Sequence, residues 1–153
     1  MEVKAYLRTY QPALKYWELC IRRLDEAKEI SLRSPKMDGM PKSGAAGGIE
    51  MQVDRILAAE KRLSKARDQA LKILNDIEDM IDSLGDFDQK TVLRLRYIDG
   101  LTWDEVAIHA NWSQRTVRRI HGRALEELRK KGGENEHDAR VYAIQGEPGQ
   151  ADQ

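Results

Sequence analysis

The stretch that decides the fold is LTWDEVAIHANWSQRTVRRIHGRALEELRKK, residues 101–131. Thr102 and Glu105 have the spacing of a capping box at a helix start, and Ser113 is a second residue of the helix-capping type. Asn111, between these two starts, tolerates the left-handed conformation that a sharp turn requires. The sequence therefore predicts two capped helices separated by a turn of three to four residues.

The apolar residues of this stretch have the spacing of a helix-turn-helix. Val106 and Ala107 lie on the first predicted helix, and Val117 and Ile120 lie on the second. Ala107 is small, which suits the point where the two helices cross closely. We assign the framework of the motif to Thr102, Ala107, Asn111, Ser113, Val117 and Ile120.

The charged residues of the second predicted helix are mostly basic. Residues 113–131 hold seven Arg and Lys against two Glu, a net charge of +5. The bases at its start lie away from Val117 and Ile120, on the face that a recognition helix presents to the DNA major groove. We predict that the DNA-contacting residues are Gln114, Arg115, Thr116, Arg118, Arg119 and Arg123. A helical hairpin with a solvated basic face is the alternative interpretation.

Residues 85–100 predict a short buried helix before the motif. Gly85 ends the preceding helix, and Asp86 with Gln89 has the D-x-x-Q spacing of a helix start. Gly100 is placed to stop the new helix. We expect burial of its apolar side chains, which are Phe87, Val92, Leu93, Leu95 and Ile98.

The first 84 residues carry two apolar seams with the spacing of packed helices. One seam consists of Leu7, Tyr10, Leu14, Trp17, Ile21 and Leu24, and the other of Ile49, Ile56, Leu63, Ala70, Ile77 and Leu84. Pro12 fits the first turn of a helix better than its interior, so we expect a leading segment to about Tyr10 and a main helix over 12–32. Residues 34–48, with two Pro and four Gly, predict a loop.

The two seams predict an antiparallel, coiled-coil-like hairpin over residues 1–84. At 1.5 Å per residue, a helix over 49–84 is about 54 Å long and one over 12–32 only about 31 Å. The shorter helix leaves part of the longer seam uncovered, which favours self-association as a homodimer. A kinked continuation of the shorter helix is the alternative cover.

The chain as a whole is predicted to be all-α, with three parts. The hairpin (1–84) and a helix-turn-helix domain (85–131) precede an acidic stretch (132–153), which we expect to be a disordered tail. The 153 residues hold 26 Lys and Arg against 26 Asp and Glu, so DNA contact requires local clustering of bases. No apolar run approaches the ~20 residues that span a membrane, and the amino terminus lacks a signal core. We therefore expect a cytoplasmic protein.

The residue types that carry catalysis and metal binding are sparse. Cys20 is the single cysteine, which excludes an internal disulfide and a cysteine-based zinc site. His109, His121 and His137 lack the spacing of metal ligands. We expect no enzyme activity, no cofactor and no metal, and we expect Cys20 to be a small core residue.

Residues 92–130, from VLRLRYIDGLT to ALEELRK, resemble region 4 of bacterial sigma factors, which reads the −35 promoter element. The whole chain resembles small phage and prophage regulators of the ArpU and RinA type, including the loop SPKMDGMP. This resemblance implies a regulator of phage late genes in the cytoplasm of a bacterial host. Its partner would be double-stranded DNA, with host RNA polymerase as a second candidate. The resemblance also places Gln114, Arg115, Thr116, Arg118 and Arg119 at the DNA-reading positions.

Three positions depart from the sigma pattern. Gln114 stands where sigma factors usually carry Arg, Arg115 where they carry Glu, and Gly122 where they carry Ala, so the −35 consensus is not expected as the target. Two other functions stay open: a small terminase-like DNA-packaging protein, and a module that docks on RNA polymerase without reading DNA. A ring of many subunits would favour packaging. A complete sigma factor is excluded, because the first 85 residues offer helical seams instead of an aromatic-rich promoter-melting region.

Overall fold

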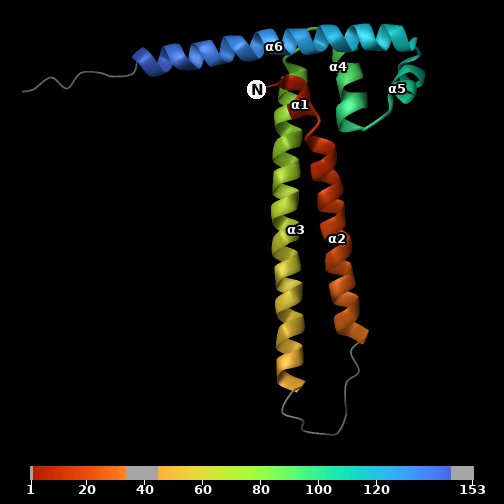
Figure 1. Ribbon diagram of the computed structural model, residues 1–153, viewed down its shortest axis with the longest axis vertical. Helices are drawn as coiled ribbons and strands as arrows, with labels where there is room; N and C mark the ends of the chain where they lie inside the picture. The colour runs from red at the N-terminus through yellow and green to blue at the C-terminus, as the bar shows by residue number, and fades with distance from the viewer. Residues whose placement is uncertain (1, 34–44, 146–153) are drawn as a thin grey trace, which may run out of the picture. The chain divides into compact units, whose positions relative to one another are not determined.

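The computed structural model describes residues 2–33 and 45–145, and these residues form helices and no strands (Figure 1). The helices are α1 (Val3–Leu7), α2 (Tyr10–Arg33), α3 (Ala45–Asp82), α4 (Phe87–Leu93), the π-helical turn η1 (Arg94–Ile98), α5 (Trp103–Ala110) and α6 (Gln114–Gln145). They form two compact units, one of Met1–Leu7 with Ile77–Gln153, the other of Arg8–Asp76. The prediction of an all-α chain is confirmed.

In the unit Arg8–Asp76, α2 and α3 run antiparallel as the predicted helical hairpin (Figure 1). Pro12 lies in the first turn of α2, where an N–H group would have no intrahelical acceptor. Small residues on α3 let the two helices approach closely. The buried residues of the hairpin are Tyr10, Cys20, Leu24, Ala66 and Ala70, so the prediction that Cys20 is a core residue is confirmed.

The apolar residues that recur every seven positions along α3 differ in how deeply they are buried. Ile77 is fully buried in the first unit, Ala70 is buried in the hairpin, and Ile49 is 66% exposed. The helix also begins at Ala45, so the prediction of a loop over 34–48 is wrong for residues 45–48. A glycine costs a helix interior only about 1 kcal/mol, which a long helix tolerates. The rest of that loop, residues 34–44, lies outside the described residues.

The other unit is assembled around α6. α1, α4 and α5 all pack against α6. Val92 and Leu93 of α4 are fully buried, and Leu95 and Ile98 are half-buried. The predicted burial of Phe87 is wrong, because this residue begins α4, points off its buried face and is 81% exposed.

After Leu93 the helix widens into the π-helical turn η1, which precedes the helix-turn-helix motif. The N–H of Asp99 donates to the carbonyl of Arg94 at 3.0 Å, and Gly100 has a φ of 72°. This left-handed backbone, which glycine adopts without strain, ends the helix where the sequence predicted. The wider turn places Tyr97 in the core, at 5% exposure.

The helix α6 extends further than expected. We predicted a disordered tail over residues 132–153, whereas α6 continues to Gln145. Gly132 and Gly133 each cost about 1 kcal/mol relative to Ala, but elongating an existing helix avoids the cost of a new nucleus. Residues 146–153 lie outside the described residues.

Candidate nucleic-acid interface

The first helix of the motif, α5, begins with a capping box. The Thr102 hydroxyl accepts a hydrogen bond from the backbone N–H of Glu105 at 3.3 Å. The Glu105 carboxylate in turn accepts from the backbone N–H of Thr102 at 2.7 Å and from its hydroxyl at 2.9 Å. These hydrogen bonds, the backbone one first, lower the pKa of Glu105 because they favour its charged form. The start of α5 is therefore held by local contacts.

The turn between α5 and α6 consists of residues 111–113. Asn111 has φ 55° and ψ 43°, a left-handed conformation. The N–H of Trp112 donates to the carbonyl of Ala107 at 3.0 Å, the long-range hydrogen bond of a Schellman helix end. Ser113 then caps α6, since its hydroxyl accepts from the N–H of Thr116 at 3.2 Å. This turn sets the angle at which α6 leaves α5.

The two helices share one apolar cluster with α4. Its buried members are Val92, Val106, Ala107, Val117 and Ile120, and Leu95, Leu101, Trp103 and Trp112 pack against it. Five of the six assigned framework residues therefore either form this cluster or lie in the turn beside it. The start of α6 is held as part of a packed core.

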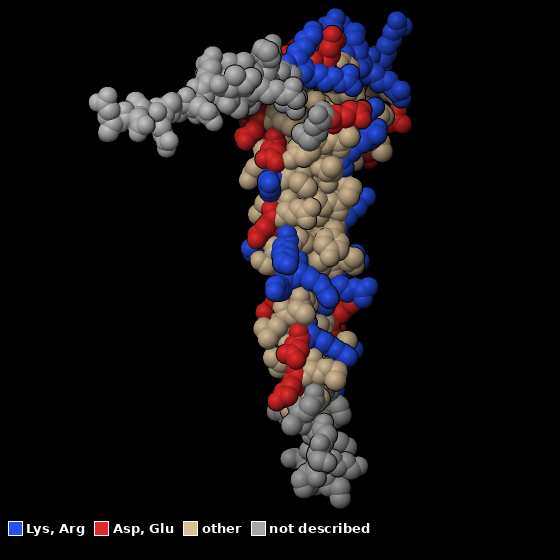
Figure 2. Space-filling view, turned by 60° about the vertical axis from the view of Figure 1, so that its left-hand side comes forward, with Lys and Arg blue, Asp and Glu red and all other residues tan. Residues whose placement is uncertain are grey.

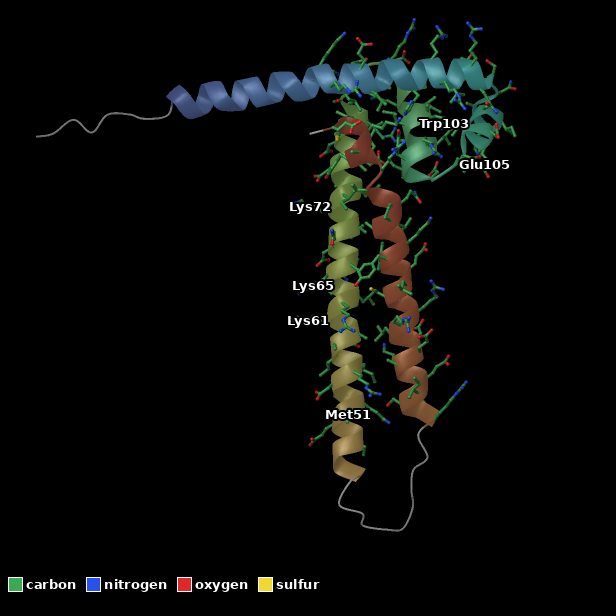
Figure 3. All side chains as sticks on the ribbon, viewed as in Figure 1. Met51, Lys61, Lys65, Lys72, Trp103 and Glu105 are labelled. Carbon is green, nitrogen blue, oxygen red and sulfur yellow. The ribbon has the colours of Figure 1, made fainter. Side chains whose placement is uncertain are left out.

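A second set of contacts under α6 was not part of the predicted site. The Tyr97 hydroxyl lies 2.8 Å from Nε2 of His121, and the Trp103 ring meets the His121 ring edge-on with centroids 4.7 Å apart. The Arg96 guanidinium lies over Trp103 at 4.8 Å and donates to the Leu101 carbonyl at 2.6 Å. Figure 3 shows Trp103 beneath α6. His121 is buried, so it supports the helix and does not face DNA.

The predicted DNA-contacting residues fall into two groups. Gln114, Arg115, Arg118, Arg119 and Arg123 are exposed on α6. Thr116 is half-buried, and its hydroxyl lies 2.9 Å from that of Ser113, so it belongs to the helix cap. In Figure 2, Lys and Arg side chains gather along the part of the molecule that carries α6.

Among the described side chains of α6, ion pairs occur only after the third turn. Lys130 pairs with Glu126 and Lys131 with Glu127, each at 3.4 Å, and Lys131 also donates to the Ser83 carbonyl. Among the described residues, no ion pair joins the arginines at the start of the helix to an acid. Of the five arginines without an ion pair in the described part of α6, four therefore lie in its first three turns, at Arg115, Arg118, Arg119 and Arg123, and the fifth is Arg129.

Gln114, the first residue of α6, also contacts α5. Its side-chain amide donates to a carboxylate oxygen of Asp104. A primary amide has a second N–H and a carbonyl oxygen, so Gln114 keeps one donor and one acceptor for a base edge. Sequence spacing could not reveal this contact, because the two residues lie on different helices.

Arg94 ties the end of α3 to η1. Its guanidinium lies 2.7 Å from Glu78 and 2.8 Å from Asp82. The hydrogen bonds to Glu78, then those to Asp82, raise the pKa of Arg94 above its ordinary value. This arginine is therefore committed to holding the unit together and is not available to DNA.

No helix in the described ranges is both long and apolar enough to span a membrane. Nor do the His, Cys, Asp and Glu side chains in these ranges form a group suited to holding a metal ion.

No curated protein and no solved structure matches the chain. Residues 86–130 match the family model described as Sigma-70, region 4, so the segment that carries α4, η1, α5 and the first half of α6 is similar to a DNA-binding helix-turn-helix domain.

Proposed function

We propose that this protein is a sequence-specific DNA-binding transcription regulator, with the start of α6 as its recognition helix. The observation that carries the proposal is the group of four exposed arginines on a helix start that a cap and a packed core hold in place. Such a helix fits the major groove, where side chains near its amino end reach base edges. The proposal assigns no catalytic step.

Two side chains are the best candidates for reading bases. Arg118 lies one turn after Gln114 on the same face. An arginine can donate two hydrogen bonds to O6 and N7 of guanine, and a glutamine amide can pair with adenine. Arg115, Arg119 and Arg123 then serve as phosphate anchors that set the register of the helix.

The regulated genes are proposed from resemblance. The likeness of the whole chain to regulators of the ArpU and RinA type supports a role in phage late-gene expression in a bacterial host. The match of residues 86–130 to Sigma-70 region 4 supports host RNA polymerase as a second partner. Both points are consistent with an activator that binds near a promoter.

The test begins with selection of bound duplexes from a random pool, followed by affinity measurements on the selected and a scrambled duplex. Arg118→Ala should lose about 1–3 kcal/mol on the selected duplex and flatten the preference for it. Arg129→Ala is the matched control, because Arg129 lies three turns later on the same helix, about 16 Å away along the axis. It should weaken both duplexes by a similar, smaller factor.

Salt dependence gives a second readout of the same proposal. Neutralisation of about four phosphates, by the anchors Arg115, Arg119 and Arg123 and by Arg129, predicts that log affinity falls with log salt at a slope of about −3 to −4. Selection that yields no common sequence, with equal losses for Arg118→Ala on both duplexes, would rule out sequence reading. A flat salt dependence would leave the basic face as a solvated surface.

A further inference from the structure

The hairpin of α2 and α3 has two lateral faces, one on each side of the contact between the helices. Lys61, Lys65 and Lys72 mark the outer side of α3, which points away from α2 (Figure 3). One lateral face contains a groove of about 620 Å³, and we call it the groove face. Its lining residues are Tyr16, Leu19, Cys20, Arg23, Glu26, Ala27, Ile30, Arg55, Ala58, Ala59 and Arg62.

The other lateral face is marked by an ion pair between the helices, in which Lys28 of α2 lies 3.9 Å from Glu60 of α3. Residues at alternating steps of three and four share a helix face with a given residue. Counting from Lys28 and Glu60 in such steps reaches the exposed aliphatic residues of this face. We call it the aliphatic face, and these residues are Ile21, Leu32, Ile49, Val53, Leu57 and Leu71.

The side chains of the aliphatic face are largely exposed to solvent in the single chain. Leu32 is 85% exposed, Leu57 56% and Val53 48%. Single exposed aliphatic residues need no explanation, but a row of them along two adjacent helices is typical of an interaction surface. A partner that packs against this face would remove these apolar side chains from water.

Charge decides which face can meet a second copy of the chain. In a symmetric contact the same surface patch faces itself, so its charges must be self-complementary. The groove face offers Arg23, Arg55 and Arg62 against one acid, Glu26. Two copies joined there would place arginines opposite arginines.

The aliphatic face instead carries both signs of charge. By the same helical spacing its acids are Glu18, Asp25, Glu50 and Glu60, and its bases are Lys28 and Arg67. Acids of one copy can thus face bases of the other around an apolar centre. Such a surface is suited to pairing with itself.

The size of the face also fits a dimer. α2 has 24 residues, and at 1.5 Å per residue it is about 36 Å long. Two helices side by side are about 20 Å wide, so the face covers about 700 Å² per copy. A symmetric contact would bury about 1,400 Å² in total, within the range of stable protein interfaces.

We propose that a second copy of this chain packs against the aliphatic face and forms a closed, symmetric dimer of hairpins. The interface consists of the six exposed aliphatic residues, flanked by the charges of both signs. This inference goes beyond the DNA-binding proposal, which concerns α6 alone. A dimer would present two recognition helices to two half-sites.

The experiment compares two neighbouring positions on α3 in the full chain. Leu57→Glu places a carboxylate in the aliphatic face, and Ala58→Glu, the matched control, places one in the groove face. Sedimentation velocity over a range of micromolar concentrations should show a dimer for the wild type and for Ala58→Glu. Leu57→Glu should weaken self-association more than about tenfold, because its charges would be desolvated and face one another. Circular dichroism checks that each variant stays helical, and Ile21→Glu repeats the test on α2.

Several results would overturn this inference. One is a wild-type protein that is a monomer at high micromolar concentration or forms assemblies larger than two chains. Another is dissociation of the dimer by Ala58→Glu instead of Leu57→Glu. A third is that the Leu57→Glu and Ile21→Glu variants fold and remain dimers. DNA binding is scored separately. Leu57→Glu should bind a single DNA site with the wild-type salt dependence, since it leaves α6 intact. Loss of all DNA binding by the wild-type protein would instead defeat the DNA proposal and leave the dimer standing.

Discussion

A single glycine interrupts α6 among the arginines proposed to contact DNA. Gly122 is exposed, and a Cβ atom built there would meet nothing within 4 Å outside its local helix backbone. No other part of the described protein therefore requires glycine at this position. The open space that it leaves on the helix surface lies one turn after Arg118 and Arg119, where a DNA backbone could approach closely.

Gly122→Ala should stabilise the folded protein by about 0.5–1 kcal/mol, because glycine is the poorer helix former. Urea unfolding followed by circular dichroism measures this change. A loss of stability would show that the glycine has a structural role. If the open space serves DNA, the same variant should bind the selected duplex more weakly despite its greater stability.

At the scale of the element, α5 depends on a charged cap. The pKa of Glu105 is below its ordinary 4.5 in the folded protein, chiefly because the Thr102 backbone N–H donates to its carboxylate. The unfolded chain therefore takes up this proton at a higher pH than the folded chain does. The capping contribution to stability is complete above the ordinary pKa and is lost as pH falls through the lower, folded value.

Glu105→Gln should therefore flatten part of the acid dependence of stability. As pH falls below 4.5 and through the lower, folded pKa of Glu105, the wild type should lose the capping contribution, whereas the neutral amide has no proton to gain. Chemical unfolding at a series of pH values measures the difference. Identical pH profiles for the two proteins would show that the cap contributes nothing that depends on charge.

At the scale of the whole molecule, the unit that carries the helix-turn-helix uses residues from both ends of the chain. Leu7 is fully buried in α1, and α1 packs against α6. The seam pattern groups Leu7 with residues of α2, yet contacts place it with Ile77 and the residues that follow. The DNA-binding unit therefore depends on a side chain near the amino terminus.

Leu7→Ala should destabilise this unit by about 2–5 kcal/mol, the usual cost of a cavity in a packed core. Ile108→Ala is the control, because Ile108 is 80% exposed on α5, and its change should stay within about 0.5 kcal/mol. Thermal unfolding of the full chain, with DNA affinity as a second readout, compares the two. Equal, small effects would show that α1 adds little to the unit.

Contacts between distant residues explain where sequence reasoning stopped. Tyr97 and His121 lie 24 positions apart and meet only because η1 and α6 are packed in one unit. Phe87 looks like a core residue by type, but its place at the first turn of α4 turns it outward. Lys131 looks like a phosphate anchor by charge, but it donates to the Ser83 carbonyl. Composition and spacing do not reveal contacts between residues so far apart in the chain.

The sequence by itself determined what depends on neighbours within one or two helical turns. The capping box of Thr102, the left-handed turn at Asn111 and the cap at Ser113 each follow from residues at most five positions apart, whose hydrogen bonds close locally. Only the tertiary structure decided which helix faces stay open and which charges stay unpaired. Those outcomes depend on how helices pack over long sequence separations, where many arrangements bury similar apolar area and one must be selected by the fit of the whole.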